Sequence, residues 1–345
     1  MLRIIKNGTS IFWRRIKCFF VYRDSLFSMV NYFLRWKEIV FLPFIIYIET
    51  NNNCNFKCLY CQVPRWDKKS IYLSKTLFIR ILDQISSLTK IRLQGIGEPL
   101  LNKEFIDMLK LGESRGIAMS FFSNGSLCNG RVAEQLAQLK NTFIIFSVDG
   151  ATAETFEKIR AGGNFQEVKE NIRNLVQLRG KKKQPMISIW SVITKDNIQE
   201  ITQIIMLAKE LGVDSISLQP FLNDWGKDEM KEYIDKVKLD IHSADTLNQI
   251  SKAKEVAKEN KIKLEVCYDS FISKKNKCTW PSKSAYIAAN GDVVPCCMLA
   301  DSDTVTMGNI FEKSFVQIWY SEKYRDFRKR IRRHDLPDYC KHCYA

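Results

Sequence analysis

The stretch Cys54-Asn55-Phe56-Lys57-Cys58-Leu59-Tyr60-Cys61 decides how the fold of this chain is interpreted, because it places three cysteines in a C-x3-C-x2-C pattern. It directly follows an apolar segment, residues 44–49, that is typical of a buried strand. Three thiolates at this spacing can bind three irons of a cubane iron–sulfur cluster and leave the fourth iron open to another ligand. On spacing alone, a zinc site or a redox pair beside a third cysteine remains an alternative.

Strand-like and helix-like segments alternate regularly after this loop. Apolar residues with helical spacing separate short β-branched and aromatic runs. The strand-like runs are residues 44–49, 91–94, 118–122, 142–148, 186–193 and 215–219. Six such units predict parallel strands joined by right-handed crossovers, fewer than the eight of a closed barrel. Polar motifs follow these strands at their C-terminal ends, where barrels of this kind carry their chemistry.

The cysteine pattern, with the aromatic Tyr60 just before the third cysteine, resembles that of the radical S-adenosylmethionine (SAM) superfamily. The alternation of strands and helices is likewise similar to that superfamily's α/β core, a partial (β/α)6 TIM-like barrel. The resemblance implies that Cys54, Cys58 and Cys61 bind a [4Fe-4S] cluster whose open iron is chelated by the amino and carboxylate groups of SAM. It also implies an external one-electron reductant of the flavodoxin or ferredoxin type. Reductive cleavage of SAM would then give a 5'-deoxyadenosyl radical that abstracts hydrogen from substrate.

The segment Gly95-Ile96-Gly97-Glu98-Pro99 resembles the superfamily's second motif, a glycine-glutamate-proline turn after the second strand. Glycine lets the backbone approach a ligand closely, and proline fixes the turn. By this resemblance Gly97, Glu98 and Pro99 contribute to the cofactor site. Glu98 and neighbouring carbonyls would accept hydrogen bonds from the SAM ammonium group.

Polar residues at the next strand ends resemble further SAM contacts. Ser123-Asn124-Gly125 is similar to the Thr-Asn-Gly segment of relatives, so Ser123 and Asn124 are expected at the cofactor. Ser147 and Asp149 share one face of their strand and, by resemblance, face the ribose and methionine end of SAM. Arg160 resembles the arginine that meets the SAM carboxylate, which complements an acceptor for the ammonium. The alternatives are helix caps and turns for the polar residues and a solvated helix end for Arg160.

A second group of cysteines lies near the C-terminus. Asn290-Gly291 is typical of a tight hairpin turn, which would fold Cys278 and Cys296 towards each other. Four cysteines in all suit structural zinc as well as an iron–sulfur cluster. The pattern resembles the SPASM/twitch extension of radical SAM enzymes, which implies an auxiliary [4Fe-4S] cluster. Its ligands would be Cys278, Cys296, Cys340 and Cys343, and no second auxiliary cluster is expected because the chain ends two residues later.

The chain has eleven cysteines, and its first ten residues do not resemble a signal peptide. This favours a reducing cytoplasm in which thiols serve as ligands, not a disulfide scaffold. Cys297 is an alternative ligand or a thiol beside the second cluster. Cys18, Cys128 and Cys267 are expected in the core. If the reaction needs a thiol hydrogen donor, Cys297, Cys267 and Cys128 are the candidates.

Charge and composition bear on the partners. The formal net charge is +15, which favours an anionic substrate such as a phosphorylated or nucleotide-linked molecule, or simply a solvated basic surface. No five-residue block is purely basic, so nucleic acid is not expected as a partner. Residues 1–42 mix aromatic and basic residues without a run long enough to span a membrane. They are expected to form helices over the main domain, with contact to a membrane surface as the alternative.

We therefore expect three parts: an N-terminal extension (1–42), the radical SAM core (43–245) and the auxiliary-cluster domain (246–345). The main hypothesis is an oxidoreductase that dehydrogenates a sugar, an aminocyclitol or a nucleotide-linked metabolite, with electron transfer to the auxiliary cluster. The alternatives are a peptide-modifying enzyme, a redox-neutral epimerase and, from another class, a cluster-bearing electron-transfer protein.

Overall fold

The computed structural model describes residues 41–341 except for 66, 223, 226 and 268–277. The expectations for residues 1–40, including Cys18, and for Cys343 lie outside this range. Residues 42–345 form one compact unit. Within its described part, no helix has the length and apolar character needed to cross a bilayer.

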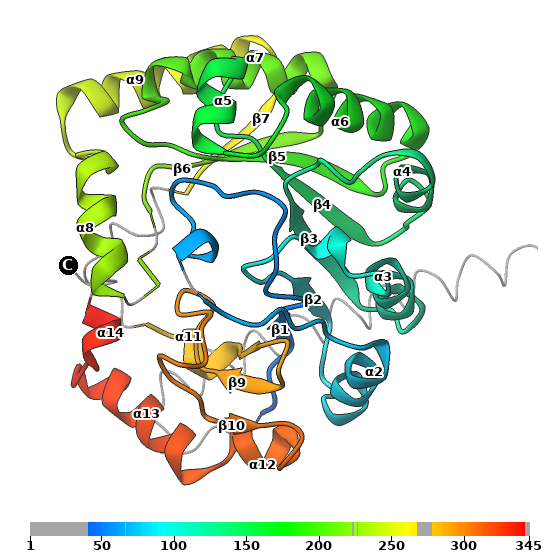
Figure 1. Cartoon of the computed structure of the whole chain (residues 1–345), viewed down its shortest axis with the longest axis vertical. Coiled ribbons are helices and arrows are strands. Elements are labelled where there is room, and N and C mark those ends of the chain that lie inside the picture. Colours follow the sequence, from blue (N-terminus) through cyan, green and yellow to red (C-terminus); the bar gives the residue numbers. More distant parts are fainter. Residues whose placement is uncertain (1–40, 66, 223, 226, 268–277, 342–345) are drawn as a thin grey trace, which may run out of the picture. The chain divides into compact units, whose positions relative to one another are not determined.

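Seven parallel strands form the core sheet and lie side by side in chain order. They are β1 (Ile45–Ile48), β2 (Lys90–Leu93), β3 (Ala118–Ser123), β4 (Thr142–Ser147), β5 (Met186–Val192), β6 (Ser215–Gln219) and β7 (Lys263–Val266). Figure 1 shows these strands in an arc, with the helices on its outer side. The predicted partial α/β barrel is therefore confirmed, with β7 as an additional strand.

The connecting helices lie between these strands in the chain. They are α2 (Lys75–Gln84), α3 (Phe105–Ser114), α4 (Gly130–Leu136), α5 (Ala153–Ile159), α6 (Phe165–Arg179), α7 (Ile201–Leu211), α8 (Asp228–Val237) and α9 (Ala244–Glu259). Three 3-10 turns, η1 (Val63–Arg65), η2 (Pro99–Leu101) and η3 (Ile198–Glu200), lie in the loops. Ser74 caps α2: its hydroxyl accepts a hydrogen bond from the Leu77 N–H at 3.1 Å.

Alternation along the strands separates the helix-covered face of the sheet from its inner face. On β3, Phe121 is fully buried against Phe105 of α3, with ring centroids 4.9 Å apart. Its neighbour Phe122 points the other way and meets Trp190 of β5 at 5.4 Å. The inner face is thus lined by the residues that alternate with the helix-facing core.

The C-terminal segment extends the same sheet. Its elements are α11 (Trp280–Lys283), β8 (Tyr286–Ile287), β9 (Asp292–Val294), β10 (Gly308–Asn309), α12 (Phe315–Trp319), α13 (Glu322–Arg333) and α14 (Asp338–Lys341). The predicted hairpin is confirmed: β8 and β9 are antiparallel around Gly291, whose φ of 87° favours glycine. β8 also pairs in parallel with β1, so the sheet has ten strands in the order β10-β9-β8-β1-β2-β3-β4-β5-β6-β7.

The expected boundary at residue 246 falls inside α9, which packs beside α7 on the core. β7, which follows α9, pairs with β6 and so continues the core sheet. We propose that the core extends through β7 and that the auxiliary domain begins after it.

Candidate functional site

The cysteine loop leaves the end of β1 and runs through the interior of the arc (Figure 1). Its three cysteines, Cys54, Cys58 and Cys61, are half-buried with free thiols. Backbone N–H groups of Phe56 and Val63 donate to the sulfurs of Cys54 and Cys61 at 3.4 and 3.5 Å. Burial raises the pKa of Cys54 to about 12 and that of Cys61 to about 11, which favours the neutral thiols; a bound cation would favour the thiolates. Soft sulfur ligands with N–H groups directed at them fit an iron–sulfur cluster.

Among the described residues, no three His, Cys, Asp or Glu side chains are arranged to hold a single metal ion. In a cubane cluster each cysteine binds a different iron, so its ligands need not converge on one point.

The glycine motif holds the start of this loop. A Cβ on Gly97 would lie 2.2 Å from Asn51 Oδ1 and 2.4 Å from the Asn53 carbonyl oxygen, so only glycine fits. The Glu98 N–H donates to the Asn53 carbonyl at 2.8 Å, and Asn51 Nδ2 donates to the Glu98 carbonyl at 2.8 Å. Pro99 is the first residue of η2, with Glu98 as its N-cap. The motif therefore fixes the loop before Cys54.

The Glu98 carboxylate is buried at the ends of β2 and β3. It accepts hydrogen bonds from the Leu100 N–H at 3.1 Å, the Ser123 hydroxyl at 2.9 Å and the Asn124 N–H at 2.7 Å. Burial raises the pKa of Glu98 to about 7. Three of about four acceptor positions on the carboxylate are thus used within the chain, and one is left for a ligand donor.

Asn124 links the end of β3 to the cysteine loop. Its Nδ2 donates to Asn55 Oδ1 at 3.0 Å and lies 3.9 Å from the Cys54 sulfur. Asn55 in turn donates to the Ser126 hydroxyl at 2.9 Å. The predicted site residues Ser123 and Asn124 are therefore brought together with the first cysteine.

Arg160 and Asp149 form an ion pair beside the second cysteine. Arg160 Nε donates to Asp149 Oδ2 at 2.6 Å, and the exposed fractions of the two side chains are 16% and 3%. The Val192 N–H holds the other carboxylate oxygen at 2.8 Å. Arg160 Nη1 lies 3.9 Å from the Cys58 sulfur. Burial opposes the charge of Arg160, but Asp149 and Cys58 outweigh it and raise the pKa of Arg160. A solvated helix end is thus excluded for this arginine.

The loop after α5 clamps the cysteine loop through the backbone. The Lys57 N–H donates to the Ala161 carbonyl at 2.7 Å, and the Leu59 N–H donates to the Ile159 carbonyl at 2.9 Å. These bonds flank Cys58 on both sides. Sequence reasoning missed this contact because backbone partners carry no side-chain signal.

Tyr60 anchors the loop on the opposite side. Its hydroxyl lies 2.9 Å from the Thr194 hydroxyl and donates to the Asp196 carboxylate. The side chain is nearly buried, so the structure places Tyr60 as a support of the loop. Ser147 ends β4 on the inner face and is only half-buried.

The β8–β9 hairpin lies between Cys278 and Cys296 in the chain, and the approach of these two cysteines to each other stays a prediction. The thiol of Cys278 has a raised pKa, mainly through burial and further through the charge of Cys296. The neighbouring Cys297 thiol and burial raise the pKa of Cys296. Cys340 lies on α14.

The remaining predicted thiols lie elsewhere. Cys128 is fully buried, which confirms the expected core position. The expected core position of Cys267 is wrong: this residue is only half-buried, because it follows β7, the edge strand of the sheet. One apolar cluster around Ile96 and Tyr286 contacts Cys61 as well as Cys296 and Cys297, so it connects the two cysteine groups.

Comparison with known proteins identifies the family to which this chain belongs. The sequence pattern of the radical SAM superfamily matches residues 48–208, and that of the SPASM iron–sulfur cluster-binding domain matches residues 278–344. The chain belongs to the radical SAM superfamily. It is an enzyme of the SPASM-containing branch, with a SAM-binding [4Fe-4S] cluster and auxiliary iron–sulfur binding.

Three relatives resemble this radical SAM protein over most of its length. The tungsten-containing aldehyde ferredoxin oxidoreductase cofactor-modifying protein of Pyrococcus furiosus is 26% identical and covers 82% of both chains. The AdoMet-dependent heme synthase of Methanosarcina barkeri is 26% identical, over 87% of this chain and 88% of its own. The PqqA peptide cyclase of Gluconobacter oxydans is 22% identical, over 80% of this chain and 76% of its own.

The fold is shared with a solved structure. Streptococcus suis SuiB bound to its precursor peptide SuiA superposes with a TM-score of 0.68 at 18% identity, over 88% of this chain and 70% of that chain. At this identity the likeness concerns the fold.

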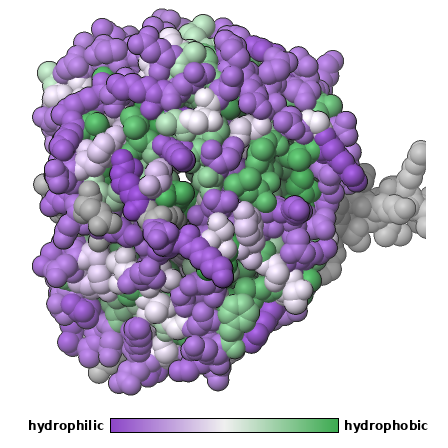
Figure 2. Space-filling view, viewed as in Figure 1, coloured by the Kyte–Doolittle hydropathy of each residue, from purple (hydrophilic) through white to green (hydrophobic). Residues whose placement is uncertain are grey.

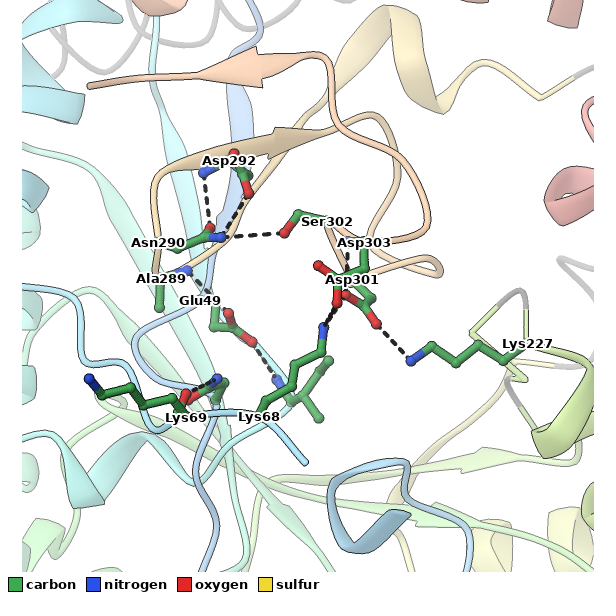
Figure 3. A network of polar contacts seen from close by, with 12 residues as sticks. Glu49, Lys68, Lys69, Lys227, Ala289, Asn290, Asp292, Asp301, Ser302 and Asp303 are labelled. Carbon is green, nitrogen blue, oxygen red and sulfur yellow. Dashed lines mark hydrogen bonds and ion pairs between the residues drawn. The ribbon is translucent and has the colours of Figure 1, made fainter. Parts of the chain in front are cut away.

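The radical SAM core and the SPASM segment meet at a buried carboxylate. Glu49, at the end of β1, accepts hydrogen bonds from the Ile96 N–H at 3.3 Å and from the Ala289 N–H at 3.1 Å (Figure 3). Burial raises the pKa of Glu49 to about 7. A Cβ on Gly95 would lie 2.3 Å from Glu49 Cγ, so the first glycine of the motif makes room for this side chain.

A second carboxylate joins three separate segments of the chain. Asp301, whose side chain is 1% exposed, pairs with Lys68 at 2.5 Å and with Lys227 at 2.7 Å. Lys68 also pairs with Asp303 at 2.7 Å, whose side chain is 76% exposed. Figure 3 shows both lysines directed at Asp301 from the cysteine-loop side and from the segment before α8. The SPASM segment is therefore attached to the core by buried polar contacts that no local pattern indicates.

Proposed function

We propose that this protein is a radical SAM enzyme that modifies a peptide substrate. The observation that carries the proposal is its similarity to the PqqA peptide cyclase over most of both chains. The shared fold with peptide-bound SuiB is compatible with it. The main hypothesis from the sequence, oxidation of a sugar or an aminocyclitol, has no support among these relatives, so peptide modification is preferred.

When bound, SAM and its cluster supply one-electron hydrogen abstraction. In this proposal, Cys54, Cys58 and Cys61 hold the cluster. Arg160, aligned by Asp149, binds the SAM carboxylate, and the free acceptor position of Glu98 receives the SAM ammonium.

The other predicted residues support this site. Gly97, Pro99, Ser123 and Asn124 fix the loop and the carboxylate, Tyr60 anchors the loop, and Ser147 faces the interior. Cys278, Cys296, Cys340 and Cys343 are the proposed ligands of the auxiliary cluster.

A second candidate is modification of a small cofactor. The cofactor-modifying protein and the heme synthase match this chain over a greater share of its length than the peptide cyclase does. Both candidates need the same SAM site, so the substrate alone distinguishes them.

The test follows hydrogen from substrate to product. The anaerobically reconstituted full-length protein is incubated with SAM, dithionite and extracts of the producing organism grown in deuterated medium. Mass spectrometry then measures deuterium in 5'-deoxyadenosine, with Cys58→Ala as the control that removes a cluster ligand.

Deuterium transfer from a peptide fraction, abolished by protease treatment, supports the proposal. Transfer from a protease-resistant small-molecule fraction favours the cofactor candidate and overturns peptide modification. The external reductant is tested separately, by replacing dithionite with a flavodoxin or a ferredoxin.

A further inference from the structure

Three polar side chains share the inner face of β2 and β3. Arg92 lies between Ile91 and Leu93, both fully buried under the helices, so its own side chain points to the inside of the arc. In the strand register Arg92 is opposite Ser120. Gln94 follows two residues after Arg92 on the same face, directly before the glycine motif of the SAM site.

These groups have unused hydrogen-bonding capacity. Among the described residues, Arg92 makes no hydrogen bond and no ion pair, and its one contact of note is with the Tyr47 ring at 5.4 Å. The Ser120 hydroxyl and the Gln94 Oε1 are buried without a hydrogen-bond partner, and Ser120 is only 6% exposed. Buried polar atoms in native proteins are nearly always paired, so unpaired ones grouped together indicate a ligand.

This region carries positive charge, which affects groups elsewhere in the interior of the arc. Lys90 lies on the same side of β2, and its pKa is lowered by burial and further by Arg92. Cys267 follows β7, which β3 to β6 separate from β2 in the sheet. Burial and Glu265 raise the pKa of Cys267 to about 11, whereas the charge of Arg92 lowers it.

Glu265 faces the same interior from β7, but within the described residues no ion pair connects it to Arg92 or Lys90. Along the sheet, β3 to β6 lie between β2 and β7, and Glu265 is exposed on β7. The positive charge of Arg92 is consequently available to an anion that enters the interior.

Aromatic rings lie near this polar group on the inner face. Tyr47, under the Arg92 guanidinium, packs against Trp280 with ring centroids 5.0 Å apart. Phe122, on the strand next to Gln94, packs against Trp190 at 5.4 Å. Figure 2 shows hydrophilic residues on the rim of this face of the molecule and hydrophobic residues nearer its middle. Such walls exclude water and strengthen a charge-assisted hydrogen bond.

We propose that Arg92, Ser120 and Gln94 form a substrate subsite that binds a carboxylate and the neighbouring N–H of a peptide. The planar guanidinium of Arg92 matches a carboxylate in two parallel hydrogen bonds. The Ser120 hydroxyl adds a third donor, and Gln94 Oε1 accepts the peptide N–H. This inference rests on the proposed function for the peptide character of the ligand, and on the structure for its charge.

The position suits a substrate anchor. Arg92 lies two residues, or roughly 7 Å, before Gln94 and three residues, or roughly 10 Å, before Gly95 at the start of the glycine motif, at about 3.3 Å per residue. A peptide held there by its carboxylate extends towards the SAM site, so the subsite selects which carbon is presented.

The test measures binding without turnover. Ligand-observed NMR titrations of the reconstituted full-length protein compare N-acetyl-L-tyrosine, its carboxamide and phenyl phosphate. We expect the carboxylate to bind about tenfold more tightly than the carboxamide. Arg92→Gln abolishes the preference for the carboxylate. Arg92→Lys keeps the positive charge but loses the two parallel guanidinium donors, so it retains part of that preference.

Controls separate binding from folding. Arg173→Gln removes an arginine of α6 that pairs with Glu170 and Glu210, and it leaves the preference intact. Cluster absorbance and SAM binding of Arg92→Gln report its folding. If that variant does not fold, Ser120→Ala is used, and it reduces the preference several-fold.

Each outcome either supports or overturns the proposed subsite. Equal binding of carboxylate and carboxamide by the unmodified protein overturns the subsite, and so does an undiminished preference in Arg92→Gln. Tighter binding of phenyl phosphate assigns the site to a phosphate ester and overturns the carboxylate. A retained carboxylate preference together with no deuterium transfer from peptides refutes the proposed function and leaves the subsite standing.

Discussion

Replacing Asp301 by asparagine tests how the SPASM segment is attached to the radical SAM core. The Asp301 side chain is 1% exposed and pairs with two lysines, Lys68 and Lys227, which remain 25% and 20% exposed. Removing one partner of a buried ion pair costs about 3–5 kcal/mol. Both lysines can turn to solvent, and asparagine keeps one acceptor oxygen. We therefore expect Asp301→Asn to lower the free energy of opening this part of the structure by about 2–3 kcal/mol.

Asp303 provides the matched control. It pairs with the same Lys68, but its side chain is 76% exposed, so Asp303→Asn is expected to cost less than about 1 kcal/mol. Hydrogen exchange of the amides between Cys296 and Thr304 measures the difference. Asp301→Asn should accelerate their exchange roughly 30- to 150-fold, and Asp303→Asn less than about fivefold. Equal acceleration in the two variants would refute the reasoning.

The two lysines also determine how the stability contributed by the Asp301 ion pairs depends on pH. Burial opposes ionisation, but Lys227 and Lys68 outweigh it and lower the pKa of Asp301. A carboxylate with a depressed folded pKa contributes stability above its unfolded pKa, about 3.9, and loses it as the pH falls through the folded value. The difference in hydrogen-exchange rate between Asp301→Asn and Asp303→Asn should therefore vanish at acidic pH.

Three further predictions concern the core. Arg160→Lys keeps the charge but loses the guanidinium geometry at Asp149, so SAM binding measured by calorimetry should weaken about tenfold with unchanged iron content; unchanged affinity would contradict the assigned role. Tyr60→Phe removes two hydrogen bonds that anchor the cysteine loop, so a chelator should bleach the cluster faster, whereas an unchanged rate would show that the anchor is dispensable. Because Glu49 has a raised folded pKa of about 7, the stability that its neutral form provides is complete below about pH 4.5 and is lost as the pH rises through 7. Thermal melting should show a loss of about 3 kcal/mol over that window in the unmodified protein and a flatter profile in Glu49→Gln; parallel profiles would count against it.

The sequence predicted the elements well because their signals are local. The strand-like run 118–122 and the Asn290-Gly291 turn depend only on neighbours in the chain, and both are confirmed. The cysteine, glycine and Ser-Asn-Gly motifs converge in space because parallel strands place their C-terminal ends at one edge.

Contacts between distant segments could not be predicted in this way. The pairing of β8 with β1 joins residues 239 positions apart, as in the Ser284 to Ile45 hydrogen bond of 2.8 Å. The α5 backbone clamp and the Asp301 contacts likewise depend on how whole elements pack. Asp301 has no motif of its own, and only its burial between two lysines distinguishes it from Asp303.

Substrate assignment departs furthest from the sequence hypothesis. The cysteine patterns specify the cofactors. In our proposal the substrate is recognised by inner-face residues such as Arg92, which belong to no sequence motif. The preference for a peptide therefore depends on relatives, and the unpaired inner-face groups bear only on the charge of the ligand.

The central claim is that Cys54, Cys58 and Cys61 carry a SAM-cleaving cluster and that the C-terminal cysteines carry another. Its most direct test is the iron and sulfide content of the anaerobically reconstituted protein, together with 5'-deoxyadenosine formed from SAM under reductant. We predict about eight irons per chain and 5'-deoxyadenosine, with half the iron and all product lost when the three cysteines become alanine. A fully loaded protein that forms no 5'-deoxyadenosine, or a triple variant that still forms it, would contradict the account.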